Sequence, residues 1–135
     1  MKRNLYTSFA IAAMLITLAG CQTKTALLCS PWKVTDVTFN EGTTLNDFQQ
    51  KKMVYMMKYD YNFAFMPDSN YRVVSMYDTT YGKWWFSKDK KQIVSLINGN
   101  ESYTDLIKLN KKEFRFKPVE PGNNIKEIKC VPSNP

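Results

Sequence analysis

The chain has 135 residues, of which 19 are Lys or Arg and 12 are Asp or Glu, and it contains no histidine. The length suits one domain. Without histidine, Ser-His and Cys-His catalysis is excluded and the commonest metal ligand is missing. The five glycines form no phosphate-binding loop, and the acidic residues form no compact motif. We therefore expect a protein that is not an enzyme and that has no cofactor and no metal site.

The first 20 residues have the order of a secretory signal. Two basic residues next to the initiator are followed by an apolar stretch from Phe9 to Ala19 and then by Gly20. Such a stretch is too short for a relaxed span of the bilayer. The sequence therefore predicts export from the cytoplasm.

Leu18-Ala19-Gly20-Cys21 resembles the lipobox of bacterial lipoproteins, in which the cysteine thiol receives diacylglycerol before the signal is removed. The resemblance implies that residues 1–20 are a signal peptide and that Cys21 becomes the lipidated N-terminus, carrying acyl chains such as palmitate. Such a chain is anchored to a membrane without spanning it. Because Gln22 stands where aspartate favours the inner membrane in enterobacterial lipoproteins, we expect the cell envelope at the outer membrane. The alternative is an ordinary signal that happens to precede a cysteine.

Removal of residues 1–20 leaves 17 basic and 12 acidic residues, a net charge of +5. The lysines are dispersed over expected turns and polar faces. This distribution is typical of a solvated surface, with a patch that faces a membrane as the alternative. Export argues against nucleic acid as a partner.

Two cysteines remain when Cys21 is set aside for lipidation. Cys29 and Cys130 bracket nearly the whole folded region, and an envelope compartment can oxidise them. A disulfide between them would close a loop of about 100 residues and add on the order of 4–5 kcal/mol in the chain-entropy model. The alternative is two reduced cysteines that pack as small apolar side chains.

Residues 21–29 have no strong pattern and suit a tether, and residues 30–135 are the expected domain. Trp32–Phe39 is rich in β-branched and aromatic residues and predicts a strand. Its apolar phase changes near Asp36, which indicates a bulge. Residues 44–58 predict one helix, because Leu45, Phe48, Lys52 and Met56 recur at helical spacing. Such a helix could close one end of the domain.

The remaining chain reads as short strands separated by polar turns. Alternation is clearest over Glu113–Lys117, where two phenylalanines share one face and three charged residues share the other. Asn98-Gly99 suits a tight hairpin. The sequence thus predicts an all-β domain, a small antiparallel up-and-down β-barrel of about eight strands with one helix. The further strands are expected at Phe63–Met66, Tyr71–Tyr77, Tyr81–Phe86, Gln92–Ile97, Tyr103–Leu109, Glu113–Lys117 and Ile125–Val131.

This pattern resembles the lipocalin-like domains of small bacterial lipoproteins. Ser30-Pro31-Trp32-Lys33-Val34 stands where those domains carry Gly-x-Trp, and Tyr81-Gly82-Lys83-Trp84 is a second match. Tyr103–Leu109 followed by Lys112-Glu113-Phe114 is similar to the ending that they share. The resemblance covers roughly residues 30–131. It implies a barrel whose interior holds one small apolar ligand.

Two functions follow as hypotheses. The first is a lipid-anchored envelope protein that binds a small apolar or amphipathic ligand, and the second is an accessory or inhibitor lipoprotein that acts by protein–protein interaction. An interior void of about 300 Å³ or more favours the first, and a filled interior favours the second. We expect Trp32, Trp84 and Phe86 to fill the interior, with Trp85 facing the opposite way from Trp84. The candidate contacts to a ligand or partner are Met53, Met56, Tyr71, Tyr77, Trp85 and Tyr103.

Overall fold

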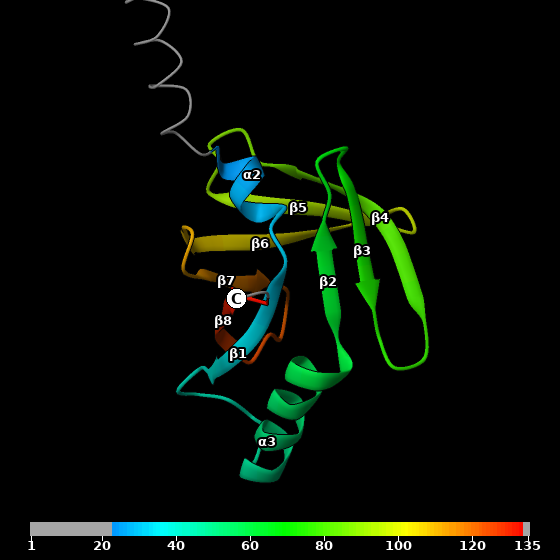
Figure 1. The fold of residues 1–135 in the computed structure, drawn as a ribbon. Coiled ribbons are helices and arrows are strands. Elements are labelled where there is room, and N and C mark those ends of the chain that lie inside the picture. Colours follow the sequence, from blue (N-terminus) through cyan, green and yellow to red (C-terminus); the bar gives the residue numbers. More distant parts are fainter. Residues whose placement is uncertain (1–22, 134–135) are drawn as a thin grey trace, which may run out of the picture.

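The structure, a computed structural model, describes residues 23–133. Its eight strands form one antiparallel sheet that curls into a nearly closed barrel, with a short helix at one end and a longer helix at the other (Figure 1). The expected signal peptide and Cys21 lie outside the described residues. The strands are β1 (Trp32–Phe39), β2 (Asn62–Phe65), β3 (Asn70–Val74), β4 (Thr79–Phe86), β5 (Gln92–Ile97), β6 (Asn100–Leu109), β7 (Phe114–Val119) and β8 (Ile125–Pro132).

The strands follow one another as an up-and-down meander. Their order in the sheet is β1-β8-β7-β6-β5-β4-β3-β2, so β8 returns to pair with β1. β1 and β2 are the two ends of the sheet and lie next to each other without a ladder between them in the described chain. The prediction of a small antiparallel barrel with about eight strands is confirmed.

A bulge in β1 turns both halves of this strand toward the interior. Trp32 pairs with Pro132 and Val34 with Cys130, and the register then shifts by one residue before Asp36 pairs with Lys129. Since side chains alternate along a strand, this shift brings Trp32 and Val37 to the same face of the sheet. Both side chains belong to the core or pack against it. The expected bulge near Asp36 is confirmed.

Aromatic side chains fill the half of the barrel that lies near the first helix. Trp84 donates a hydrogen bond from Nε1 to the carbonyl oxygen of Met66 (2.9 Å), and Trp32 donates one to Leu27 (3.2 Å). Each indole is therefore buried with its polar atom paired, as a buried tryptophan requires. Trp32, Trp84 and Phe86 fill the interior as predicted. The buried core cluster is Leu28, Trp32, Phe65, Trp84, Ile93, Phe114, Ile125, Ile128 and Cys130.

The expected tether contains the first described helix, α2 (Lys24–Leu28). The Thr23 side chain accepts a hydrogen bond from the Ala26 backbone N–H and caps the start of the helix. Leu28, the last residue of α2, is fully buried in the core. In the described residues, α2 therefore packs on the barrel through Leu28, although it lies within the expected tether.

The predicted helix over residues 44–58 starts later and continues further. α3 spans Asp47–Tyr55, and a π-helical segment, η1 (Met56–Asp60), extends it. Asn46 and Gln49 form a reciprocal capping box that fixes the start. Phe48 shares the predicted helical spacing with Leu45 and Met56, yet its side chain is 74% exposed and does not pack inward. α3 contains no fully buried residue, and it contacts the core through the partly buried side chain of Met53.

The expected disulfide is absent from the structure, because Cys29 and Cys130 are both free thiols. Cys130 points inward and stands opposite Val34 in the ladder, whereas Cys29 caps the C-terminal end of α2 before β1 begins. The two residues are therefore not partners in the strand register. Burial raises the pKa of the Cys130 thiol to about 12, and burial followed by the nearby Asp68 carboxylate raises the pKa of the Cys29 thiol. The structure therefore agrees with the alternative, in which Cys29 and Cys130 are reduced and pack as small apolar side chains.

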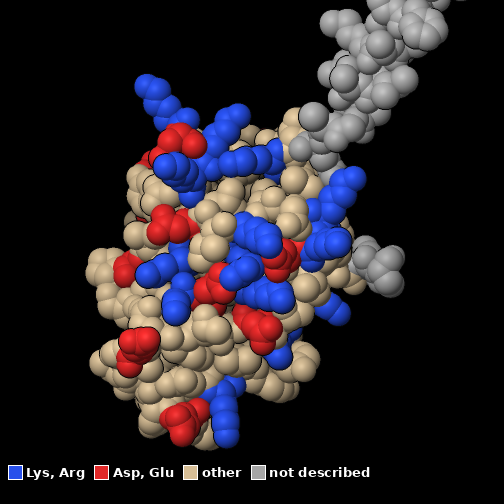
Figure 2. All heavy atoms as spheres, turned by 90° about the vertical axis from the view of Figure 1, so that its left-hand side faces the viewer, with Lys and Arg blue, Asp and Glu red and all other residues tan. Residues whose placement is uncertain are grey.

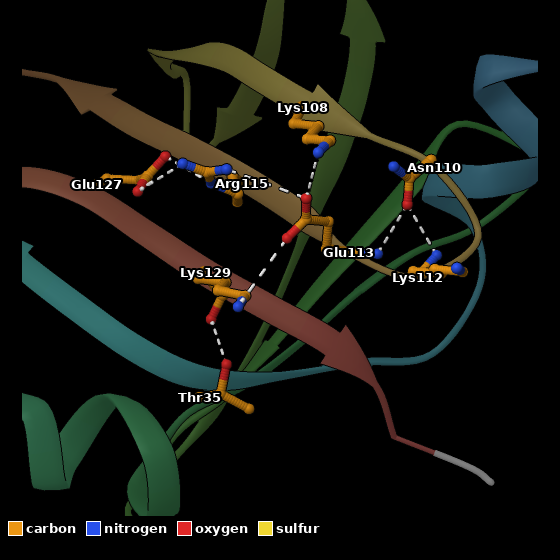
Figure 3. A network of polar contacts seen from close by, with 8 residues as sticks. All are labelled: Thr35, Lys108, Asn110, Lys112, Glu113, Arg115, Glu127 and Lys129. Carbon is orange, nitrogen blue, oxygen red and sulfur yellow. Dashed lines mark hydrogen bonds and ion pairs between the residues drawn. The ribbon is translucent and has the colours of Figure 1, made fainter.

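The outer face of β6, β7 and β8 carries a network of charged side chains (Figure 3). The Glu113 carboxylate forms a salt bridge with Lys108 Nζ at 2.6 Å and lies 4.0 Å from Lys129 Nζ. Arg115 pairs with Glu127 at 2.8 Å. The hydrogen bond from Lys108 is the main reason that the pKa of Glu113 lies below its usual value. Ion pairs at a protein surface contribute little to stability. These pairs confirm that the charged face of Glu113–Lys117 is the outer face of the strand.

Basic and acidic side chains are mixed on this side of the barrel. Figure 2 shows Lys and Arg standing among Asp and Glu across the face that is seen from the left of Figure 1. This mixture is typical of a solvated surface. Among residues 23–133, no helix is long and apolar enough to cross a membrane.

Candidate functional site

The barrel is open at the end that faces α3, opposite the filled end at α2. A cavity of about 290 Å³ lies inside the barrel there, and a smaller void of about 50 Å³ continues toward the filled half. Most of the wall is apolar, because the inward positions of β2, β3, β7 and β8 hold aromatic and branched residues. The cavity is lined by Val34, Met57, Tyr61, Phe63, Tyr71, Val73, Ser95, Ile97, Ser102, Thr104, Phe116, Pro118, Glu120 and Ile128.

Besides Tyr61, four residues with side-chain hydroxyl groups interrupt this apolar wall. Ser95 on β5 stands directly opposite Ser102 on β6, and Thr104 follows two residues later on the same inward face. Tyr71 faces the same cavity from β3. Within residues 23–133, none of these four side-chain hydroxyls has a protein hydrogen-bond partner. They form a polar band on an otherwise apolar surface, which we call the hydroxyl band.

Burial affects the acid–base behaviour of one member of the band. Loss of hydration raises the pKa of the Tyr71 hydroxyl to about 12. Tyr71 also stacks on Phe65, with ring centroids 4.9 Å apart, which fixes its ring against the filled half of the barrel. The Tyr71 hydroxyl is therefore a neutral group throughout the physiological pH range.

A groove of about 530 Å³ lies outside the barrel between α3 and the turn that joins β7 to β8. Met57, Tyr61 and Glu120 line both this groove and the interior cavity, so the two spaces meet at these residues. Flexible thioethers form much of the groove, and methionine adapts its shape to different apolar surfaces. The groove is lined by Leu45, Gln49, Lys52, Met53, Met56, Met57, Tyr61, Glu120, Gly122, Asn123, Asn124 and Ile125.

Three of the six predicted contact residues belong to this site. Met53 and Met56 line the groove and Tyr71 lines the cavity. These three come from separate elements, namely α3, η1 and β3, which the fold brings to one end of the barrel.

The other three predicted contacts lie outside the site. Tyr77 is 92% exposed in the turn between β3 and β4. Trp85 and Tyr103 point outward from β4 and β6, as the alternation with inward-facing Trp84 and Thr104 requires. Tyr103 donates a hydrogen bond to Glu101 (2.7 Å), which raises the pKa of the tyrosine. These three residues therefore line neither the cavity nor the groove, and their role as contacts to a ligand or partner stays a prediction.

Sequence reasoning missed Ser95, Ser102 and Thr104. A signal was present in the alternation, since Ser95 shares a face with Ile93 and Ile97, and Ser102 shares one with Thr104. Small polar residues on the inward face of a barrel strand mark places where the wall does not fill the interior. Met57 and Tyr61 were missed because they lie at the end of the predicted helix.

The chemistry of the two spaces follows from the residues that line them. Glu120 at the rim and Lys52 in the groove are the charged residues that line the two spaces. Among residues 23–133, no group of three or more His, Cys, Asp and Glu side chains is placed to hold a metal ion. The site can therefore bury an apolar molecule and hydrogen-bond a polar group of that molecule.

A family model described as a domain of unknown function, DUF4822, matches residues 24–134. The chain belongs to this family. The match begins at the first residue of α2, so the DUF4822 domain includes the helix that closes the filled end of the barrel. Comparisons with curated proteins and with solved structures found no significant match.

Proposed function

We propose that this DUF4822 protein is a lipid-anchored protein of the cell envelope that binds one small apolar or amphipathic ligand in the open half of its barrel. The observation that supports binding is the interior cavity of about 290 Å³, which joins a groove of about 530 Å³. Ligand sites in proteins commonly have volumes of roughly 300–1,000 Å³ and predominantly apolar walls. The resemblance to lipocalin-like domains points to the same type of ligand.

The first described helix, α2, and the opening of the cavity lie at opposite ends of the barrel, which supports one orientation of the domain on a membrane. α2 and α3 lie at opposite ends of the barrel (Figure 1). Met57 of η1, the segment that extends α3, lines the cavity, so the cavity opens at the end away from α2. An acyl anchor on Cys21 would hold the filled end near the bilayer and leave the opening directed away from it. α2 and the turns at residues 87–91 and 110–112 carry six lysines and one acidic residue, Asp89. Lysines in this number favour an anionic lipid surface.

Lipidation is tested by Cys21→Ala. Because the thioether link is the proposed attachment, we expect the variant to be lost from the membrane fraction or to keep residues 1–20 uncut. Intact mass of the extracted wild-type protein should show a chain that begins at Cys21 with a diacyl or triacyl increment. A trimmed Cys21→Ala protein that stays fully membrane-bound would contradict the proposal.

Ligand binding is tested with N-phenyl-1-naphthylamine, a neutral dye whose emission rises in apolar surroundings. The nine residues of the buried core cluster run from Leu28 to Cys130, so a chain that begins at Gln22 contains this whole cluster. We expect saturable binding at one equivalent, with quenching of tryptophan emission, because Trp84 and Trp32 lie in the adjoining half of the barrel. Met56→Ala should weaken binding and leave the thermal unfolding midpoint nearly unchanged. Linear, unsaturable emission would reject the proposal.

The second candidate function, binding of an envelope protein, is favoured by one feature of the outer face. Trp85, Val94, Tyr103 and Val119 are paired in turn across β4, β5, β6 and β7 and form a continuous row. Trp85 is 39% and Tyr103 41% exposed. If this row is the functional surface, a photo-crosslinking residue at Trp85 captures a partner in intact cells, whereas the same residue at Tyr77 does not.

A further inference from the structure

We propose that the ligand carries an uncharged hydrogen-bonding group, such as a hydroxyl, a carbonyl or an amide, which the hydroxyl band binds inside the barrel. This inference rests on the proposed function, and it names the chemical class of the ligand. Tyr71, Ser95, Ser102 and Thr104 are the residues that contact the polar group. The apolar part of the ligand then extends toward Met57 and the groove.

The position of the hydroxyl band is the first reason. Ser95 and Ser102 are directly opposed on neighbouring strands, so their hydroxyls can approach the same atom of a ligand. Tyr71 faces them across the cavity and reaches the small void beyond it, as Ser95 and Thr104 also do. A polar group held there would lie at the inner end of the site, next to the filled half of the barrel.

The free hydrogen-bonding capacity of these hydroxyls is the second reason. In residues 23–133 the only fully buried side-chain polar atom without a partner is Arg72 Nε, so the four hydroxyls stay accessible to water while the cavity is empty. A ligand that displaces this water must offer hydrogen bonds in its place, since an unpaired polar group away from bulk water costs free energy. In the described chain, the four side chains have no protein partner. A ligand hydroxyl, carbonyl or amide can donate to or accept from them, and each serine or threonine hydroxyl can serve in either role.

The distribution of charge excludes an ionised group at this depth. Among residues 23–133, Glu120 is the one charged residue that lines the cavity, and it lies where the cavity meets the groove. No Lys or Arg of this described part lines the interior cavity, so a buried carboxylate or phosphate would lack a counter-charge. Burial of an unpaired charge is far more costly than burial of a paired neutral group. Neutral Tyr71 provides a hydrogen-bond donor and no positive charge.

The experiment compares octan-1-ol with octanoate at pH 8 as competitors of N-phenyl-1-naphthylamine on the chain that begins at Gln22. The two competitors share an apolar chain and differ in the charge of the head group. We expect octan-1-ol to displace the dye with an affinity at least about tenfold higher than octanoate, because only the alcohol can enter the hydroxyl band without burying a charge. This comparison uses the unmodified sequence of the domain and depends on no variant.

A double variant of the hydroxyl band and a control variant outside the site test where the polar group of the ligand binds. Ser102→Ala combined with Thr104→Val should lower the affinity for octan-1-ol about fivefold to tenfold by removing two hydrogen-bonding groups. Dye binding, which is dominated by apolar contact, should change by less than about twofold. Tyr77→Phe, which changes an exposed tyrosine outside the site, is the matched control and should leave both affinities unchanged. If the double variant does not fold, Ser95→Ala tests the same band with a smaller change.

Each outcome separates this inference from the proposed function. Saturable dye binding with octanoate equal to or tighter than octan-1-ol would overturn the inference and leave ligand binding in place. That result is expected if Lys52 in the groove holds a carboxylate at the mouth. Saturable dye binding that neither competitor reduces would also overturn the inference. Failure of the dye itself to bind would reject the proposed function.

Discussion

Phe114→Ala is expected to lower the free energy of unfolding by about 3–5 kcal/mol, the range for removal of a buried phenylalanine side chain. Phe114 is 1% exposed and stacks on Phe116 with ring centroids 4.7 Å apart. It also contacts Trp32 at 5.8 Å and Phe65 at 6.3 Å. The rings around it come from different strands, so the cavity left by the substitution cannot collapse easily. Urea unfolding monitored by tryptophan emission measures the change.

Tyr77→Ala provides the matched control, because this aromatic side chain is 92% exposed. Its substitution should change the free energy of unfolding by less than about 0.5 kcal/mol. A loss of less than about 1 kcal/mol in Phe114→Ala would contradict the assignment of Phe114 to the centre of the filled half.

Ser102→Phe is expected to abolish binding of N-phenyl-1-naphthylamine while the domain stays folded. Ser102 lines the interior cavity, so the added benzyl ring enters free space of about 290 Å³ and occupies it. In a closely packed site, an enlarged side chain forces neighbouring groups apart and destabilises the protein. Here the empty volume removes most of that cost. Dye titration and thermal unfolding of the same preparation measure both effects.

Tyr103→Phe is the control for this substitution, since the adjacent side chain points outward and hydrogen-bonds Glu101. It should leave dye binding unchanged. Undiminished binding in a folded Ser102→Phe protein would place the dye elsewhere than in the interior cavity.

Much of the barrel can be predicted from local pattern, because the inward and outward faces of a strand differ in polarity. Glu113–Lys117 alternates aromatic and charged residues, and the structure places Phe114 inside and Arg115 in the outer charged network. The phase change near Asp36 likewise predicts the bulge in β1. Positive φ angles at Asn98 and Gly99 agree with the predicted tight hairpin.

The errors have a common physical origin, since they concern contacts between distant segments. α2 is too short to show helical periodicity, and the burial of Leu28 depends on the barrel that receives it. The disulfide prediction used the even number of remaining cysteines and not the register, which pairs Cys130 with Val34. Phe48 fits an apolar stripe by spacing alone, yet the helix turns its Met53 side to the groove.

The candidate site was predicted only in part for the same reason. Tyr71 could be selected for its aromatic ring, but the direction in which each ring points depends on strand register. One residue of register decides whether Tyr103 or Thr104 faces the cavity. The hydroxyl band itself depends on which inward positions remain unfilled, and this is a property of the whole barrel.

The most direct test of interior binding is to follow the dye titration by two-dimensional amide NMR of the uniformly ¹⁵N-labelled chain that begins at Gln22. If the ligand occupies the open half of the barrel, the largest shifts fall on the amides of Tyr71, Ser95, Ser102 and Thr104, and on Met57 at the mouth. The turn at residues 87–91, at the filled end, should not respond. Shifts confined to Trp85, Tyr103 and Val119 on the outer face would contradict interior binding and favour a surface that contacts a partner.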